Sequence, residues 1–136
     1  MSGVRATGGC LCGAVRYAVH GPLRDVVLCH CSRCRRSHGH VAAYAACARG
    51  DLVVEDAEPL RWYEADGRAR AFCGRCGASL FWRAEGRPTV SVAAGTLDQP
   101  TGLRTVAQIF TRDRGDYYAL GGEGECFAGA LPAGAP

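Results

Sequence analysis

The sequence predicts a mostly β domain of short antiparallel strands, and three observations support this prediction. Apolar and polar residues alternate over short runs, as at Val15, Tyr17 and Val19, which would share one face of a strand. Turn signals rich in Gly, Pro and Asp recur between these runs. Helical periodicity is almost absent. Several short strands separated by frequent turns are typical of an all-β or mostly β architecture.

The expected strands follow one another along the chain, and most are separated by a turn. Apolar or alternating runs predict strands at residues 15–19, 25–28, 42–47, 60–64, 80–82, 89–93 and 105–111. Turns are expected at residues 20–22, 49–51, 65–67, 84–88 and 99–102. The one candidate helix is a weak helical turn at residues 32–38. No repeat or interior linker interrupts this order.

Length and composition fit one ordinary globular domain. The chain has 136 residues, of which 48% are hydrophobic and 21% charged, and these fractions are typical of soluble proteins. We expect one domain over residues 1–125 and a loose tail over residues 126–136, because residues 128–136 carry no charge and no periodicity. No apolar leader or membrane-length segment is visible. We therefore expect a cytoplasmic protein without a membrane partner.

Nine cysteines are the unusual feature of this composition. Disulfides are rare in a reducing compartment, so clustered cysteines indicate metal binding or redox chemistry. Seven of the nine fall into three tight groups: Cys10 and Cys12; Cys29, Cys31 and Cys34; Cys73 and Cys76. Glycines flank the first and third groups, and they permit the positive φ that a turn around a metal ion requires.

The total of seven suggests two metal sites. A closed structural zinc site takes four protein ligands, whereas a catalytic site takes three and keeps one position open. The middle group, Cys29, Cys31 and Cys34, can form an open site without help from other residues. The remaining four cysteines could then form a closed site that joins distant parts of the chain: Cys10, Cys12, Cys73 and Cys76.

Three other interpretations of the cysteines stay open at this point. A single zinc ribbon could use Cys31 and Cys34 with the third group, which would leave Cys10, Cys12 and Cys29 unexplained. A redox dithiol is a second option, although the βαβ pattern of a thioredoxin-like motif is absent. Ordinary buried cysteines are the third, and this interpretation suits Cys47 and Cys126, which lie outside the groups.

Histidines and arginines near the middle group are weaker candidates. His30 lies between two candidate ligands, so we expect its side chain to point away from the metal. His38 and His40 follow closely and could carry protons near neutral pH or serve a structural role. Three arginines adjoin the group, and they could bind a carboxylate-bearing ligand or form a solvated face: Arg33, Arg35 and Arg36.

Four stretches of the sequence together resemble one protein family. They are Gly-Gly-Cys-Leu-Cys-Gly-Ala-Val-Arg-Tyr from Gly8, Cys-His-Cys-Ser-Arg-Cys-Arg-Arg from Cys29, Phe-Cys-Gly-Arg-Cys-Gly from Phe72, and residues 92–98. This pattern is similar to the glutathione-dependent formaldehyde-activating enzyme family, which includes centromere protein V-like domains. The resemblance covers about residues 8 to 115, and its three-part cysteine pattern is specific.

The resemblance implies a zinc-binding domain with a β-tent fold and two Zn²⁺ ions per chain. By resemblance, the structural zinc ligands are Cys10, Cys12, Cys73 and Cys76. Also by resemblance, Cys29, Cys31 and Cys34 hold the catalytic zinc. The implied activity is that of a carbon–sulfur lyase acting on a small thiol such as glutathione or on its aldehyde adduct, with S-hydroxymethylglutathione-type chemistry.

The competing function class is a non-catalytic zinc module that binds a protein or a nucleic acid. Charge argues against nucleic acid, because seven thiolates and two Zn²⁺ ions would bring the formal charge of +3 to about zero. No basic stripe interleaved with aromatic residues is visible either. The sequence does not indicate an oligomeric state.

Overall fold

The computed structural model describes residues 3–133, and these residues fall into two compact units. The first unit combines residues up to 24 with residues 45–102. The second combines residues 25–44 with residues from 103 onward. Among the described residues, no helix is both long enough and apolar enough to cross a lipid bilayer.

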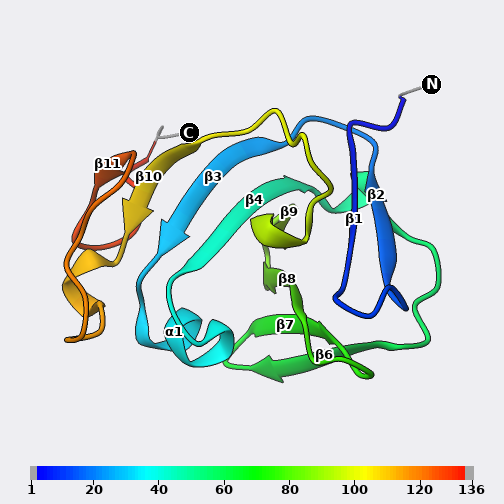
Figure 1. Cartoon of the computed structure of the whole chain (residues 1–136), viewed down its shortest axis with the longest axis horizontal. Coiled ribbons are helices and arrows are strands. Elements are labelled where there is room, and N and C mark those ends of the chain that lie inside the picture. The colour runs from blue at the N-terminus through cyan, green and yellow to red at the C-terminus, as the bar shows by residue number, and fades with distance from the viewer. Residues whose placement is uncertain (1–2, 134–136) are drawn as a thin grey trace. The chain divides into compact units, whose positions relative to one another are not determined.

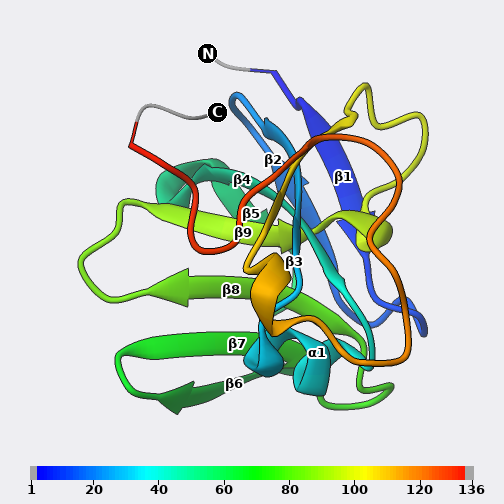
Figure 2. The ribbon, with the colours of Figure 1, turned by 90° about the vertical axis from the view of Figure 1, so that its left-hand side faces the viewer.

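The first unit contains a small antiparallel sheet and a β-meander. The small sheet has the order β1-β2-β5, formed by β1 (Ala6–Gly9), β2 (Arg16–Val19) and β5 (Leu52–Val54). The meander contains β6 (Leu60–Ala65), β7 (Arg68–Cys73), β8 (Ser79–Ala84) and β9 (Thr89–Ala93), each antiparallel to the next. Figure 2 shows these four strands one above another, from β6 to β9. Two 3-10 turns complete the unit, η1 (Arg49–Asp51) and η2 (Ala94–Thr96).

Buried side chains of β2, which alternate, and of β8, where Leu80 and Phe81 are adjacent, build the core of this unit. The rings of Tyr17 and Phe81 meet edge to face with their centroids 5.1 Å apart, and both side chains are buried. The Tyr17 hydroxyl hydrogen-bonds the Thr96 hydroxyl at 2.7 Å, so the polar end of this buried ring is satisfied. Gly8 lies against the same ring, and any side chain there would collide with the Tyr17 hydroxyl. Glycine at position 8 therefore allows β1 to approach the core closely.

The second unit is formed around β3 (Arg24–Cys29) and β10 (Thr105–Ile109), which lie side by side in Figure 1. These two strands pair in parallel, and β10 also pairs in parallel with the short β11 (Glu125–Cys126). The short antiparallel strands that the sequence predicts are confirmed in the first unit, whereas these two pairings of β10 are parallel. The unit also contains η3 (Thr111–Asp113) and the start of β4 (Ala42–Ala48), a strand in which the unit boundary falls.

The predicted helical turn is present as α1 (Ser32–His38). Its N-cap is Cys31, whose sulfur accepts the Cys34 N–H at 3.4 Å. Its C-cap is Gly39, with φ of 80°, and the Gly39 N–H donates to the Arg35 carbonyl at 2.7 Å. This left-handed glycine ends the helix after two turns.

The segment expected to be a loose tail begins within β11. The Phe127 N–H donates to the Gln108 carbonyl at 2.8 Å, and the Phe110 N–H donates to the Gly129 carbonyl at 2.9 Å. Main-chain hydrogen bonds thus join residues 127–129 to β10 and the residue after it. Residues 134–136 of the expected tail lie outside the described residues.

Candidate metal centres

The first cysteine cluster gathers four sulfurs in the first unit. Cys10 and Cys12 follow β1, Cys73 ends β7, and Cys76 lies in the turn between β7 and β8. All four sulfurs lie within 4.8 Å of one another. The Sγ–Sγ distances are 3.6 Å for Cys10 and Cys12 and 3.8 Å for Cys12 and Cys73. A tetrahedral zinc with Zn–S bonds of about 2.3 Å separates its sulfurs by about 3.8 Å, so this cluster fits a closed metal site.

Main-chain N–H groups point at these sulfurs. The Val15 N–H donates to Cys10 Sγ at 3.3 Å, and the Arg75 and Cys76 N–H groups each donate to Cys73 Sγ at 3.4 Å. Gly77 follows the last cysteine with φ of 78° and lets the turn close. Such donors stabilise thiolates, the form of cysteine that binds metal.

Main-chain donors and neighbouring thiols hold two of the thiol pKa values below the ordinary value. The main-chain N–H of Ala78 lowers the pKa of Cys76 most, and that of Cys12 lowers it further, to about 6. Burial acts to raise the pKa of Cys10, but the Val15 N–H and the neighbouring thiols hold it below its ordinary value. The Ala14 N–H acts to lower the pKa of Cys12, but burial and the neighbouring thiols raise it to about 11. Negative charge in this cluster is therefore favoured on Cys76 and Cys10 rather than on Cys12.

The second cluster brings Cys29, Cys31 and Cys34 together within the second unit. Cys29 ends β3, Cys31 caps α1, and Cys34 lies in the first turn of that helix. The three sulfurs lie within 4.8 Å of one another, and those of Cys29 and Cys34 are 3.0 Å apart. Cys29 and Cys34 are buried while Cys31 is half-buried. A ligand approaching this cluster therefore meets Cys31 first.

Mutual hydrogen bonds among these thiols separate their pKa values. The thiols of Cys29 and Cys34 lower the pKa of Cys31 to about 2, and the same interactions raise the pKa of Cys29 well above its ordinary value. The cluster thus holds a thiolate at neutral pH, and that charge rests on its most accessible sulfur. Three sulfurs without a fourth described ligand can hold a metal ion and leave one position for a small molecule.

His30 lies between two of these cysteines, and its ring is fixed by residues far along the chain. Its Nδ1 is 2.7 Å from the Tyr118 hydroxyl, and its Nε2 is 2.8 Å from Gln108 Oε1. The Gln108 Nε2 donates to the carbonyls of Gly121 and Glu123, so Oε1 is an acceptor and His30 Nε2 carries a proton. In a neutral ring, Nδ1 then accepts from Tyr118. Both nitrogens of His30 are engaged away from the cluster.

The other two histidines that the sequence selects each pair with a tyrosine. His38 Nε2 lies 2.8 Å from the Tyr44 hydroxyl, and His40 Nδ1 lies 2.7 Å from the Tyr117 hydroxyl. His40 also packs edge to face on the Tyr118 ring at 4.7 Å. This connects His40 through Tyr118 to His30. Sequence spacing does not reveal these tyrosine and glutamine partners, because all but Tyr44 lie 77 to 88 residues away.

The two remaining cysteines lie outside both clusters. Cys47 is buried in β4, and burial raises the pKa of its thiol to about 11. It is therefore a neutral packing group at physiological pH, as the sequence suggests. Cys126 is exposed on β11. All nine cysteines are described by the structure, and all are free thiols.

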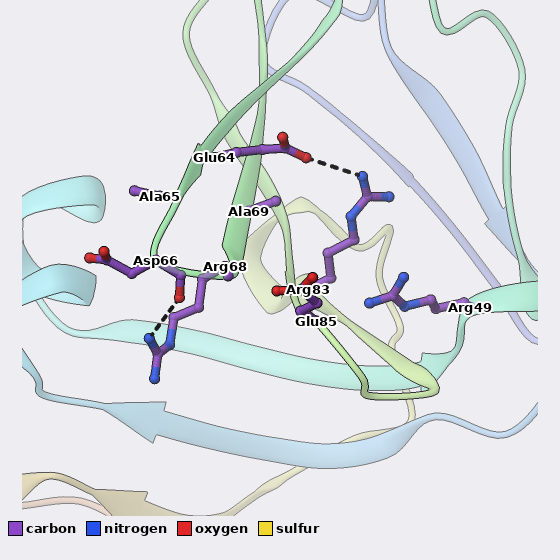
Figure 3. A pocket seen from close by; sticks show the side chains of 9 residues that line it. Arg49, Glu64, Ala65, Asp66, Arg68, Ala69, Arg83 and Glu85 are labelled. Atoms are coloured by element: carbon purple, nitrogen blue, oxygen red, sulfur yellow. Dashed lines mark hydrogen bonds and ion pairs between the residues drawn. The ribbon is translucent and has the colours of Figure 1, made fainter.

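A pocket of about 520 Å³ lies in the first unit, and none of its lining residues is a cysteine. Figure 3 shows charged side chains of both signs around it, among them Arg49, Arg83, Glu64 and Glu85. Arg83 pairs with Glu64 at 4.0 Å and its guanidinium lies 3.9 Å from the centre of the Trp62 ring. The charged groups around the pocket partly neutralise one another. The two cysteine clusters, which could hold metal ions, both lie outside the residues that line it.

Comparison with known proteins gives one consistent result. The model of a family described as glutathione-dependent formaldehyde-activating enzyme matches residues 5–113. A curated protein of Halomonas elongata, provisionally named as such an enzyme, is 36% identical in an alignment of length 108 that covers 68% of each of the two chains. A crystal structure of a Rhodobacter sphaeroides protein matches with a TM-score of 0.60 and 31% identity. That match covers 73% of this chain and 97% of the other.

Proposed function

The chain belongs to the glutathione-dependent formaldehyde-activating enzyme family, and from this premise we propose that it is a zinc-dependent carbon–sulfur lyase. Its substrate would be a small thiol of the glutathione type together with formaldehyde, or the adduct of the two. A cytoplasmic location belongs to the proposal, because the cysteine clusters must stay reduced to bind metal.

The proposed reaction adds a thiol to an aldehyde. The thiol sulfur forms a C–S bond to the carbonyl carbon, the π electrons of the C=O bond move to oxygen, and that oxygen takes the proton that the thiol loses. The product is an S-hydroxymethyl thioether. The reverse direction breaks the C–S bond and returns the thiol and formaldehyde, which is the lyase direction.

Cys29, Cys31 and Cys34 would hold the metal ion at which this chemistry occurs. A zinc ion bound there lowers the pKa of a thiol that binds to it and polarises a carbonyl. Cys31 is half-buried beside two buried cysteines, which supports the approach of a substrate from the Cys31 side. This accessible cluster of three sulfurs, in a family named for thiol and aldehyde chemistry, is the observation that carries the proposal.

The surrounding residues would position the ligands and move the proton. Gln108 and Tyr118 hold the His30 ring from both sides, and this fixes the backbone between Cys29 and Cys31. The Tyr117 hydroxyl and His40 form an exposed hydrogen-bonded pair that could deliver the proton to the aldehyde oxygen.

The other cluster would have a structural role in this scheme. Its four sulfurs would complete the coordination of a second zinc ion, which leaves no position for a substrate. That ion would join the segment after β1 to the end of β7.

Exchange between glutathione, formaldehyde and their adduct, followed by NMR, tests the proposal. We expect the zinc-loaded chain to accelerate exchange above the spontaneous rate. We expect Cys31→Ser to remove the acceleration, while Cys126→Ser, outside both clusters, retains it. Equal rates with and without the wild-type chain would instead favour a non-catalytic zinc module.

A further inference from the structure

The side chain of Arg35 contains a buried donor without an acceptor. Its Nε has no hydrogen-bond partner among the described residues. Buried polar groups in folded proteins are almost always paired, and a charged guanidinium is among the most costly to leave unpaired. The chain thus keeps an N–H of Arg35 ready for an acceptor that its described residues do not supply.

Arg35 lies on α1 one helical turn after Cys31, whose sulfur is the most accessible of the second cluster. Residue 35 is four positions after Cys31, and the Arg35 N–H donates to the Cys31 carbonyl at 2.9 Å. Side chains four residues apart share one helix face, and long helical side chains lean toward the N-terminus. From these rules we expect the Arg35 side chain to extend toward the turn that holds Cys31.

Charge around this position favours an anion. No aspartate or glutamate occurs between Asp25 and Asp51, so neither α1 nor its flanking segments can supply a carboxylate to Arg35. The neighbouring Arg36 is exposed, as expected of a solvated charge. Arg35 thus differs from Arg36 in having a donor withdrawn from water.

We propose that Arg35 binds a carboxylate of the thiol substrate and so selects anionic thiols over neutral ones. The inference rests on the proposed function and names the substrate class more closely. A guanidinium binds a carboxylate with two parallel N–H groups, and one such pair consists of Nε and a terminal nitrogen. A carboxylate is also planar and has two acceptor atoms, so it can satisfy the unpaired Nε once a shift of the Arg35 side chain uncovers that buried atom.

Calorimetric titration of the zinc-loaded chain with glutathione and with glutathione diethyl ester tests this inference. The two ligands have the same thiol, but the ester lacks both carboxylates. We expect wild type to bind glutathione at least about tenfold more tightly than the ester, as for a charged hydrogen bond. Arg35→Met should bind both ligands alike and bind the ester as wild type does, which also shows that the variant is folded.

Two further variants sharpen the result. Arg35→Lys keeps the charge but loses the paired N–H groups, so it should recover only part of the preference. Arg36→Met should keep the full preference. A wild type that binds the two ligands equally, or neither of them, or an Arg35→Met variant that keeps the preference, would overturn the inference.

The same samples distinguish this inference from the proposed function. A carboxylate preference that depends on Arg35, without accelerated formaldehyde exchange, would contradict the lyase proposal and support the binding site. Accelerated exchange without a carboxylate preference would support the lyase proposal and contradict the binding site at Arg35.

Discussion

Replacing Cys73 by serine tests whether the first cluster clamps the fold. Cys12 and Cys73 are separated by 61 residues, whereas Cys29 and Cys34 in the second cluster are separated by 5. A cross-link that closes a longer loop removes more conformational entropy from the unfolded chain. Losing the first clamp should therefore destabilise the fold more than losing the second.

The loop lengths give the size of the difference. Chain-entropy estimates are about 4 kcal/mol for the loop of 61 residues and about 2 kcal/mol for the loop of 5. Cys73→Ser should thus lose about 2 kcal/mol more free energy of unfolding than Cys34→Ser. For 136 residues this corresponds to a melting temperature lower by about 8 °C.

The two variants are well matched for this comparison, because both cysteines are buried and both substitutions are nearly isosteric. Circular dichroism monitors urea unfolding in reducing buffer. The preparations used are those in which each variant holds one zinc ion fewer than wild type. Cys126→Ser, exposed and outside both clusters, serves as the control and should unfold as wild type does. A Cys34→Ser variant that is destabilised as much as Cys73→Ser, or more, would refute the reasoning.

Three further predictions concern residues outside the cysteine clusters. Burial raises the pKa of Tyr17 from 10.0 to about 12. The free energy of unfolding therefore has its full value below pH 10 and falls by about 3 kcal/mol as the pH rises to about 12. Tyr17→Phe should not show this loss in urea titrations across that pH range. A hydrogen bond from Arg16 lowers the pKa of Asp98, so its stabilising effect is present above the ordinary value of 3.8 and is lost as the pH falls below it. Asp98→Asn should therefore show a weaker loss of melting temperature on acidification than wild type, and an equal loss would contradict this. Gln108→Leu removes the acceptor of the His30 Nε2 proton and should cost about 2 kcal/mol of unfolding free energy; an unchanged urea midpoint would show that the amide does not hold the ring.

Much of the candidate site could be predicted because its ligands are local in sequence. Two cysteines separated by one or two residues curl around a single point, so the spacing alone indicates three groups of ligands. The helical turn at residues 32–38 was also predictable, because Gly39 follows it and can adopt the left-handed conformation that ends a helix. Joining Cys10 and Cys12 to Cys73 and Cys76 was an expectation from the count of ligands, and the structure brings these four sulfurs together.

Long-range partners could not be predicted in the same way. The hydrogen bonds of His30 to Gln108 and Tyr118 span 78 and 88 residues, and no periodicity or motif encodes such contacts. The contact with Gln108 arises because β10 pairs in parallel with β3, and a parallel register is set by tertiary packing rather than by a turn. The buried Nε of Arg35 was hidden for a similar reason, since Arg33, Arg35 and Arg36 look alike in sequence.

The most direct test of the central claim is the zinc content of freshly purified, reduced protein, measured by elemental analysis. With a closed cluster of four sulfurs and an open cluster of three, we expect two zinc ions per chain. A folded chain that contains no zinc and takes up none on zinc add-back would contradict both metal sites and favour redox chemistry of the cysteines.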